Sequence, residues 1–217
     1  MGTRTKFISL TRALVRREGL RIRSGSAATF LERLAELDLP RPLHREIAPL
    51  LRELAHLNTE IHKANEALRR HVRQNVTVER LCSAPGVGPV TATSFVATLD
   101  RADRFRGAHQ VQAYLGLVPR ENSSGEHQHK GRITKTGNRR TRALLVEAAW
   151  ALLRQGRQPE LMPLREWAER LAVRRGRRVA VVALARKLSG ILYAMMRDGT
   201  TFDPDRWKHS QVPQGRA

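Results

Sequence analysis

Seven basic residues surround a serine-glycine turn between Pro119 and Arg142, in the sequence PRENSSGEHQHKGRITKTGNRRTR, with only two glutamates among them. This composition is poor for a protein core and suits the binding of phosphate groups. A polyanion is therefore the expected partner. The candidate phosphate ligands in this stretch are Arg120, Lys130, Arg132, Lys135, Asn138, Arg139, Arg140 and Arg142.

A helix is expected directly after this stretch. Gly137 and Asn138 predict its turn and N-cap, and its apolar face is Leu144, Leu145, Ala148, Ala149 and Leu152. Three of the candidate arginines fall in its first turn, where the macrodipole and the free N–H groups are already positive. Cations there cost about 0.3 to 1 kcal/mol each, which is easier to understand if an anion occupies the helix N-terminus. The alternative is a solvated basic face.

The whole chain is basic, because 40 lysines and arginines against 20 acidic residues give a formal net charge of +20. Nucleic acid is the leading partner for such a charge. With 217 residues, 41% of them hydrophobic, the chain can build one sizeable core or two small ones. We see no signal peptide and no apolar stretch of about 18 residues, so we expect a cytoplasmic protein without a membrane partner.

The candidates for redox or metal chemistry are few. The single cysteine, Cys82, excludes an intramolecular disulfide and is expected to be a partly buried structural thiol. His127 and His129 have the spacing of a metal clamp, but no cysteine and no carboxylate other than Glu126 completes a coordination set. No metal site and no cofactor are predicted in this chain.

The first 77 residues are expected to form a helical linker and coiled coil. Helices are predicted from Thr3 to about Glu18 and from about Ala27 to Leu37. A heptad seam follows: Leu43, Ile47, Leu50, Leu54, Leu57, Ile61, Ala64 and Leu68. Pro49 either kinks this helix or marks its first turn. The seam predicts either a coiled coil over 43–68 that makes a homo-oligomer or an antiparallel hairpin inside one subunit, and spacing does not separate the two.

A second domain is expected over 78–200, beginning with the segment VERLCSAPGVGPVTATSFVATL at 78–99. This segment fits a helix-hairpin-helix element that grips a DNA backbone without reading its sequence. Gly86 and Gly88 would let bare N–H groups approach a phosphate, Val87 would fill the space between the helices, and the small Ala92 would let them pack closely. The alternative is an ordinary glycine-rich turn.

The remaining patterns complete a mainly α fold. Helices are predicted over 108–115, with Val111, Tyr114 and Leu115 packed inward, over 164–172, and over 179–197 with Gly199 as a stop. The serine region over 116–142 can form one small β-hairpin that pairs residues 116–119 with 132–134. The tail from 201 to 217 is expected to be disordered.

With these motifs in view, the chain resembles the C-terminal two-thirds of the insertion-sequence transposases of the "one-ten" group, also called DEDD transposases. The resemblance covers about Thr3 to Asp203. It lies in the following segments: PGVGPVTA, YLGLVPRENSSG, GRITKTGNRRTR, LLVEAAWALL and RRVAVVALARKLSGILYAMMRDG.

The resemblance implies a bacterial, nucleoid-associated protein for DNA transposition and recombination at a transposable element. In this family an N-terminal RNase H-like domain binds magnesium through three Asp and one Glu, and a structured guide RNA pairs with target and donor DNA. A C-terminal domain supplies a serine nucleophile, which corresponds here to Ser124, with Ser123 as the alternative. Attack by this hydroxyl on a phosphodiester needs surrounding cations and a base or metal.

The metal-binding domain is expected to be absent from this chain. The carboxylates of the first forty residues, Glu18, Glu32, Glu36 and Asp38, lie on helical or loop patterns rather than on a central strand. We therefore expect the DNA-binding, serine-bearing portion of a transposase, inactive alone, with magnesium needed only alongside the other domain. The alternative is a non-catalytic DNA- or RNA-binding module. A structural RNA-binding protein fits less well, because only 5% of the residues are aromatic.

Overall fold

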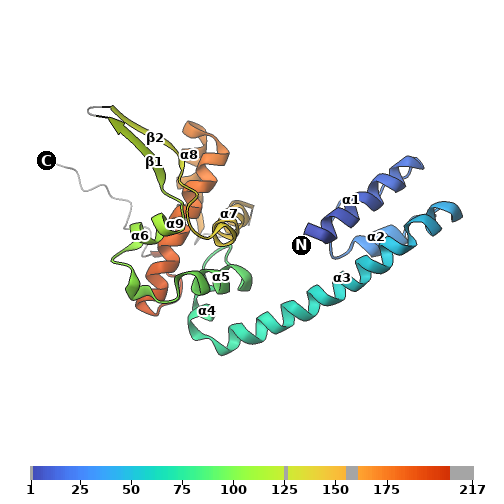
Figure 1. Cartoon of the computed structure of the whole chain (residues 1–217), viewed down its shortest axis with the longest axis horizontal. Coiled ribbons are helices and arrows are strands. Elements are labelled where there is room, and N and C mark those ends of the chain that lie inside the picture. The colour runs from blue at the N-terminus through green and yellow to red at the C-terminus, as the bar shows by residue number, and fades with distance from the viewer. Residues whose placement is uncertain (1, 125–126, 155–160, 206–217) are drawn as a thin grey trace. The chain divides into compact units, whose positions relative to one another are not determined.

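The computed structural model describes residues 2–124, 127–154 and 161–205, and within 121–130 it describes the strand backbone but no side chains. The described chain is mainly helical with one pair of antiparallel strands, which confirms the expected fold class (Figure 1). It divides into two compact units, unit 1 from Met1 to Leu68 and unit 2 from Arg69 to Ala217. The division falls inside a helix, upstream of the change of sequence pattern at 77.

Unit 1 contains α1 (Gly2–Arg17), α2 (Phe30–Ala35) and the larger part of α3 (Arg41–Gln74). The first helix runs antiparallel to α3, because Arg4 Nη1 donates to Asn58 Oδ1 at 3.3 Å while Arg17 pairs with Glu46. The three helices enclose a small apolar core. The helix α2 is shorter than the helix predicted over 27–37. The buried members of this core are Ile8, Val15, Ile22, Phe30, Leu34, Leu43, Ile47 and Leu54.

The heptad seam of α3 is used inside one subunit only over its first half. Leu43, Ile47 and Leu54 are buried in the core of unit 1. The later seam residues Ile61 and Leu68 are half-buried and belong to neither apolar core of the described residues. The antiparallel packing is thus formed up to Leu54, while oligomerisation through the second half stays a prediction. Pro49 lies inside α3 and does not mark its first turn.

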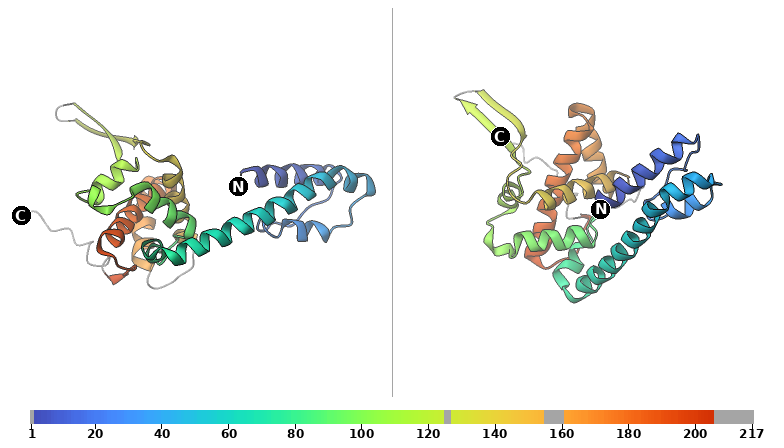
Figure 2. Two further views of the ribbon diagram at one scale, coloured as in Figure 1. Left: turned by 60° about the horizontal axis from the view of Figure 1, so that its bottom comes forward. Right: turned by 45° about the vertical axis from the view of Figure 1, so that its right-hand side comes forward.

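Unit 2 is built around its last helix, α9 (Arg177–Asp198), which packs against α4, α6, α7 and α8 (Figures 1 and 2). By length and composition this helix would fit a bilayer, whereas the sequence was expected to contain no such stretch. Most of its apolar side chains are buried against the other helices of unit 2, which accounts for its composition. Gly199 ends it in the left-handed conformation, as predicted. The other helices of unit 2 are α4 (Val76–Leu81), α5 (Pro89–Leu99), the 3-10 turn η1 (Ala102–Arg104), α6 (Ala108–Tyr114), α7 (Arg139–Arg154) and α8 (Met162–Arg175).

The prediction that Tyr114 packs inward is wrong. Its side chain is 42% exposed, and its ring meets the edge of Phe105 with the centroids 5.3 Å apart. Val111 and Leu115 are buried instead, because residues four apart share one face of a helix while Tyr114 lies beside that face.

Candidate nucleic-acid interface

The two strands form an arm that extends away from the helices of unit 2 (Figures 1 and 2). Strand β1 (Pro119–Ser124) pairs with β2 (His127–Ile133), with Pro119 opposite Ile133 at the base and Ser124 opposite His127 at the far end. The strands are longer than the predicted pairing, and Ser123 and Ser124 end a strand. Strands are predicted from alternating apolar residues, and an arm without a buried face has no such pattern. The length of the arm could therefore not be predicted from the sequence. Gly125, expected in the turn, lies outside the described residues.

The base of the arm is held against α6 by close backbone packing. Gly116 and Gly137 have φ values of +67° and +70°. A Cβ at Gly137 would overlap the carbonyl oxygen of Tyr114, and one at Gly116 would overlap that of Thr136. The Lys135 N–H also donates to the Gly116 carbonyl oxygen at 3.1 Å. These contacts require glycine at both positions and fix where the arm leaves the domain.

Arg142 reinforces this base from inside the domain. Its side chain is buried, and its Nη1 donates to the carbonyl oxygens of Leu115 at 3.0 Å and Thr136 at 2.7 Å. A buried guanidinium needs such partners, since leaving it without hydrogen bonds would be costly. The structure therefore gives Arg142 a positioning role, in contrast to the expected contact with a phosphate.

The N-terminus of α7 is capped as predicted and is joined to α5. Asn138 Oδ1 accepts hydrogen bonds from the backbone N–H groups of Arg140 at 3.0 Å and Thr141 at 3.1 Å. Asn138 Nδ2 donates to Thr98 Oγ1 at 3.2 Å, and Thr141 Oγ1 lies 2.7 Å from the hydroxyl oxygens of both Ser94 and Thr98. The Asn138 side chain thus already has partners in the fold, which leaves the neighbouring arginines as the groups free to meet a ligand.

Most of the other predicted phosphate ligands face solvent. Arg139, Arg140, Lys135 and Arg132 are exposed, as is Arg120, whose Nη2 lies 3.5 Å from the Thr134 carbonyl oxygen. Lys130 lies on β2, and its side chain is outside the described set. The exposed cations therefore gather on the arm and at the start of α7.

The two predicted hairpin glycines lie in the turn between α4 and α5 and have different environments. Val87 and Ala92 are buried in the core of unit 2, where they were expected to pack. A Cβ at Gly86 (φ +74°) would overlap the carbonyl oxygen of Ala148, so packing against α7 is the reason for this glycine. Gly88 is exposed and its backbone is extended, and a Cβ added there would meet no atom within 4 Å. It is the N-cap residue of α5 and offers no side-chain cap. The contact of this turn with DNA stays a prediction.

These groups do not converge on one pocket. Helices α5 and α7 run antiparallel, since Gly86 meets Ala148 while Ser94 meets Thr141. Gly88 and the start of α7 therefore lie at opposite ends of α5, about 15 Å apart at about 1.5 Å per residue. The five steps along β1 likewise put Ser124 about 16 Å from the base of the arm. The arrangement suits a ligand with many phosphates.

The described residues offer little further chemistry near these groups. Cys82 is half-buried, and burial together with the nearby Glu79 carboxylate raises the pKa of its thiol. Among the side chains that the structure describes, which exclude those of 121–130, no group of three or more His, Cys, Asp and Glu could hold a metal ion. The described part of the chain thus contains cations and backbone donors but no metal-binding carboxylate set.

Comparison with known proteins shows which family part of this sequence resembles. Residues 78–162, which include most of α4, the helices α5 to α7 and the arm, match the Transposase IS116/IS110/IS902 family. The chain is 35% identical over 208 residues to a probable family 20 transposase of Pseudomonas aeruginosa, covering 93% of this chain and 61% of that protein. These findings support its assignment to the insertion-sequence transposases of this group.

Two other relatives are also similar to this chain. The transposase for insertion sequence element IS1111A of Coxiella burnetii is 33% identical over 207 residues, covering 92% of this chain and 56% of that protein. A pilin gene-inverting protein of Moraxella lacunata is 28% identical over 130 residues, covering 59% of this chain and 39% of that protein. The chain thus spans little more than half the length of the first two relatives.

Proposed function

We propose that this chain is the nucleic-acid-binding, serine-bearing part of an insertion-sequence transposase, with Ser124 as its nucleophile. The observation that carries the proposal is the arm: Ser124 is the last residue of β1, at the far end of the arm, and Arg142 holds the base of the arm against the domain. It lies within the segment that matches the transposase family. Ser123, its neighbour on the same strand, is the alternative nucleophile.

The proposed reaction is a transfer of one DNA strand to serine. The Ser124 oxygen attacks the phosphorus of a phosphodiester, a new O–P bond forms, and the bond from phosphorus to one deoxyribose oxygen breaks. That oxygen leaves with a proton, and the serine hydroxyl gives up its own. The described residues do not include a carboxylate set for magnesium, so we assign no step to a metal in this chain.

The exposed cations of unit 2 would hold the DNA during this reaction. Arg139 and Arg140 start α7, where the helix N-terminus also favours an anion. The length of the arm separates them from Ser124 within one chain, so we infer that they grip a different phosphate from the one attacked. Gly88, which has no packing reason to be glycine, would let a third phosphate approach the uncapped start of α5.

Two partners complete the proposal. A structured guide RNA is a second candidate for the same cations, because contacts to phosphate do not distinguish the two nucleic acids. A second copy of the chain is the candidate for the later half of the α3 seam, whose apolar residues belong to neither core of the described chain.

The first prediction tests the nucleophile. Supplied with the carboxylate-bearing domain of a full-length relative, guide RNA, magnesium and labelled DNA, the chain should form a protein–DNA adduct. Protease digestion followed by mass spectrometry should place the attached nucleotide on Ser124. Ser124→Ala should abolish the adduct, while Ser123→Ala, the matched control one residue away, should retain it. Without those additions the chain should not cleave DNA.

Each contrary result has a definite meaning. An adduct that persists in Ser124→Ala and disappears in Ser123→Ala would show that the neighbouring serine is the nucleophile. Recombination without an adduct in any variant would contradict the serine mechanism. It would favour the alternative of a non-catalytic binding module.

A further inference from the structure

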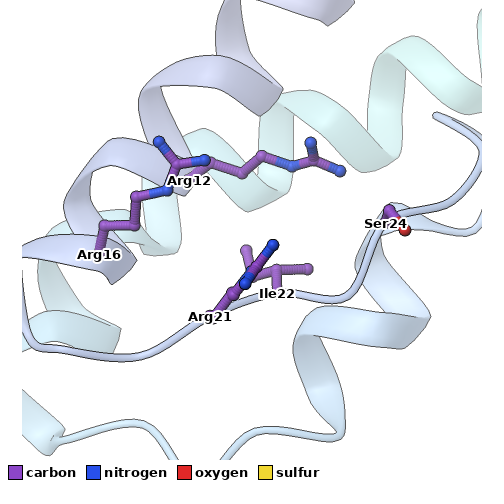
Figure 3. A pocket seen from close by; sticks show the side chains of 5 residues that line it. All are labelled: Arg12, Arg16, Arg21, Ile22 and Ser24. Atoms are coloured by element: carbon purple, nitrogen blue, oxygen red, sulfur yellow. The ribbon is translucent and has the colours of Figure 1, made fainter.

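Unit 1 contains a second group of cations, distant in sequence from the arm. Three arginines, with Ile22 and Ser24, line a small pocket of about 100 Å³ between α1 and the segment that follows it (Figure 3). No carboxylate is part of this lining. A buried water needs roughly 10 to 15 Å³ by a comparable measure, so the pocket has room for a polyatomic anion.

The chain fold brings the three arginines together. Arg12 and Arg16 are four residues apart on α1 and therefore share one face of that helix. The chain reverses after Gly19, where φ is +74°, and carries Arg21 and Ser24 to the same pocket. Figure 3 shows Arg12 and Arg16 extending from the helix toward the pocket, and Arg21 facing them from the segment that follows α1.

Arg12 is held in place but lacks part of its hydrogen bonding. Its guanidinium carbon lies 5.6 Å from the centroid of the Phe30 ring, a favourable cation–π distance. Its Nε is buried and has no hydrogen-bond partner in the described part of the chain. A buried donor of this kind normally has a partner. Arg12 therefore keeps one donor that the described residues leave unsatisfied.

The neighbouring arginines show that unit 1 usually satisfies such groups. Arg17 pairs with Glu18 and Glu46, Arg23 pairs with Glu36, and Arg33 donates to backbone carbonyl oxygens. In contrast, the guanidinium groups of the three pocket arginines form no ion pair with any described residue. Their charge is therefore available to an external anion.

We propose that this pocket, lined by Arg12, Arg16 and Arg21, binds one phosphate group of a nucleic-acid strand. Guanidinium groups match the geometry of phosphate oxygens, and the Ser24 hydroxyl adds a further donor. Exposed Arg16, Arg21 and Ser24 form a rim that a strand can reach, and the net charge of +20 favours a polyanion over a single free anion. The proposal concerns another unit and does not rest on Ser124 or on catalysis.

The test reads the pocket directly by NMR of the arginine Nε–Hε groups in the full chain. In phosphate-free buffer, a short single-stranded DNA should shift the Arg12, Arg16 and Arg21 signals together, while the same sequence with a neutral methylphosphonate backbone should not. Arg21→Gln should weaken the binding reported by the Arg12 signal by about tenfold, the loss expected for one charge-assisted hydrogen bond. Arg45→Gln is the matched control, because it removes one exposed positive charge of unit 1 outside the pocket.

Two results would overturn the proposal. If inorganic phosphate shifts these signals and DNA does not, the pocket is a site for a free anion and not for a nucleic-acid strand. If Arg21→Gln and Arg45→Gln weaken the binding equally, the pocket contributes only general charge. Both Arg16→Gln and Arg21→Gln change exposed side chains, so a folded variant is available to decide the question.

Discussion

Arg140 and Arg142 are two residues apart and have different environments. The Arg140 side chain is exposed at the start of α7, whereas that of Arg142 is buried and donates to two backbone carbonyl oxygens at the base of the arm. Both arginines were candidates for contact with phosphate. The difference in burial separates a group that can meet a ligand from one that positions the arm.

The second prediction compares these two residues. Arg142→Met should lower the free energy of unfolding by about 1 to 3 kcal/mol, because the Leu115 and Thr136 carbonyl oxygens lose a buried donor. Arg140→Met should leave the free energy of unfolding nearly unchanged and weaken DNA binding. Urea unfolding and fluorescence anisotropy with labelled DNA measure the two effects. Equal stability of both variants would show that Arg142 does not hold the base of the arm.

At the scale of the element, α3 combines two kinds of surface in one helix. Ile47 is fully buried in the core of unit 1, whereas Ile61, two heptads later, is half-buried and outside both cores of the described residues. The same spacing therefore serves packing within one chain at one end and leaves an apolar stripe at the other.

The third prediction tests that stripe. If it pairs with a second copy, Ile61→Asp should weaken self-association by tenfold or more, as expected from about 1.5 to 3 kcal/mol for a buried isoleucine. His62→Asp introduces the same charge next to the seam and serves as the control. Sedimentation equilibrium measures the association, and circular dichroism should show unchanged helix content. A monomeric wild-type chain would exclude this mode of pairing.

At the scale of the whole molecule, the net charge of +20 is spread over separate groups rather than over one site. The far end of the arm at Ser124 lies about 16 Å from its base, and the turn at Gly88 lies about 15 Å from the start of α7. A nucleic acid that contacts the arm, the start of α7 and this turn must therefore use several phosphates. Such binding is driven mainly by the release of counterions.

The fourth prediction follows from the use of several phosphates. The logarithm of the affinity for duplex DNA should fall with the logarithm of salt concentration, with a slope of about −0.9 for each phosphate contacted. Replacing Arg139 and Arg140 by glutamine should make the slope less steep by about one to two such increments. Anisotropy titrations at several salt concentrations provide the measurement. A flat dependence in the wild type would contradict a phosphate-based interface.

The local features of this protein can be read from its amino-acid sequence. The helices expected over 108–115 and 179–197, the Asn138 cap and the Gly199 stop agree with the structure, because caps, stops and periodic apolar faces depend on residues close together in the chain. The transposase motifs and the basic composition around Ser124 were also evident from the sequence, and they led to the family that the comparisons support.

The long-range partner of each side chain became known only from the folded structure. It showed that Gly86 packs against Ala148, that Arg142 binds backbone rather than solvent, and that Tyr114 is exposed. It also gathered Arg12, Arg16 and Arg21 around one pocket. Residue type states what a side chain can bind, but burial and neighbours brought together by the fold determine which of those interactions it makes, and these depend on contacts between distant parts of the chain.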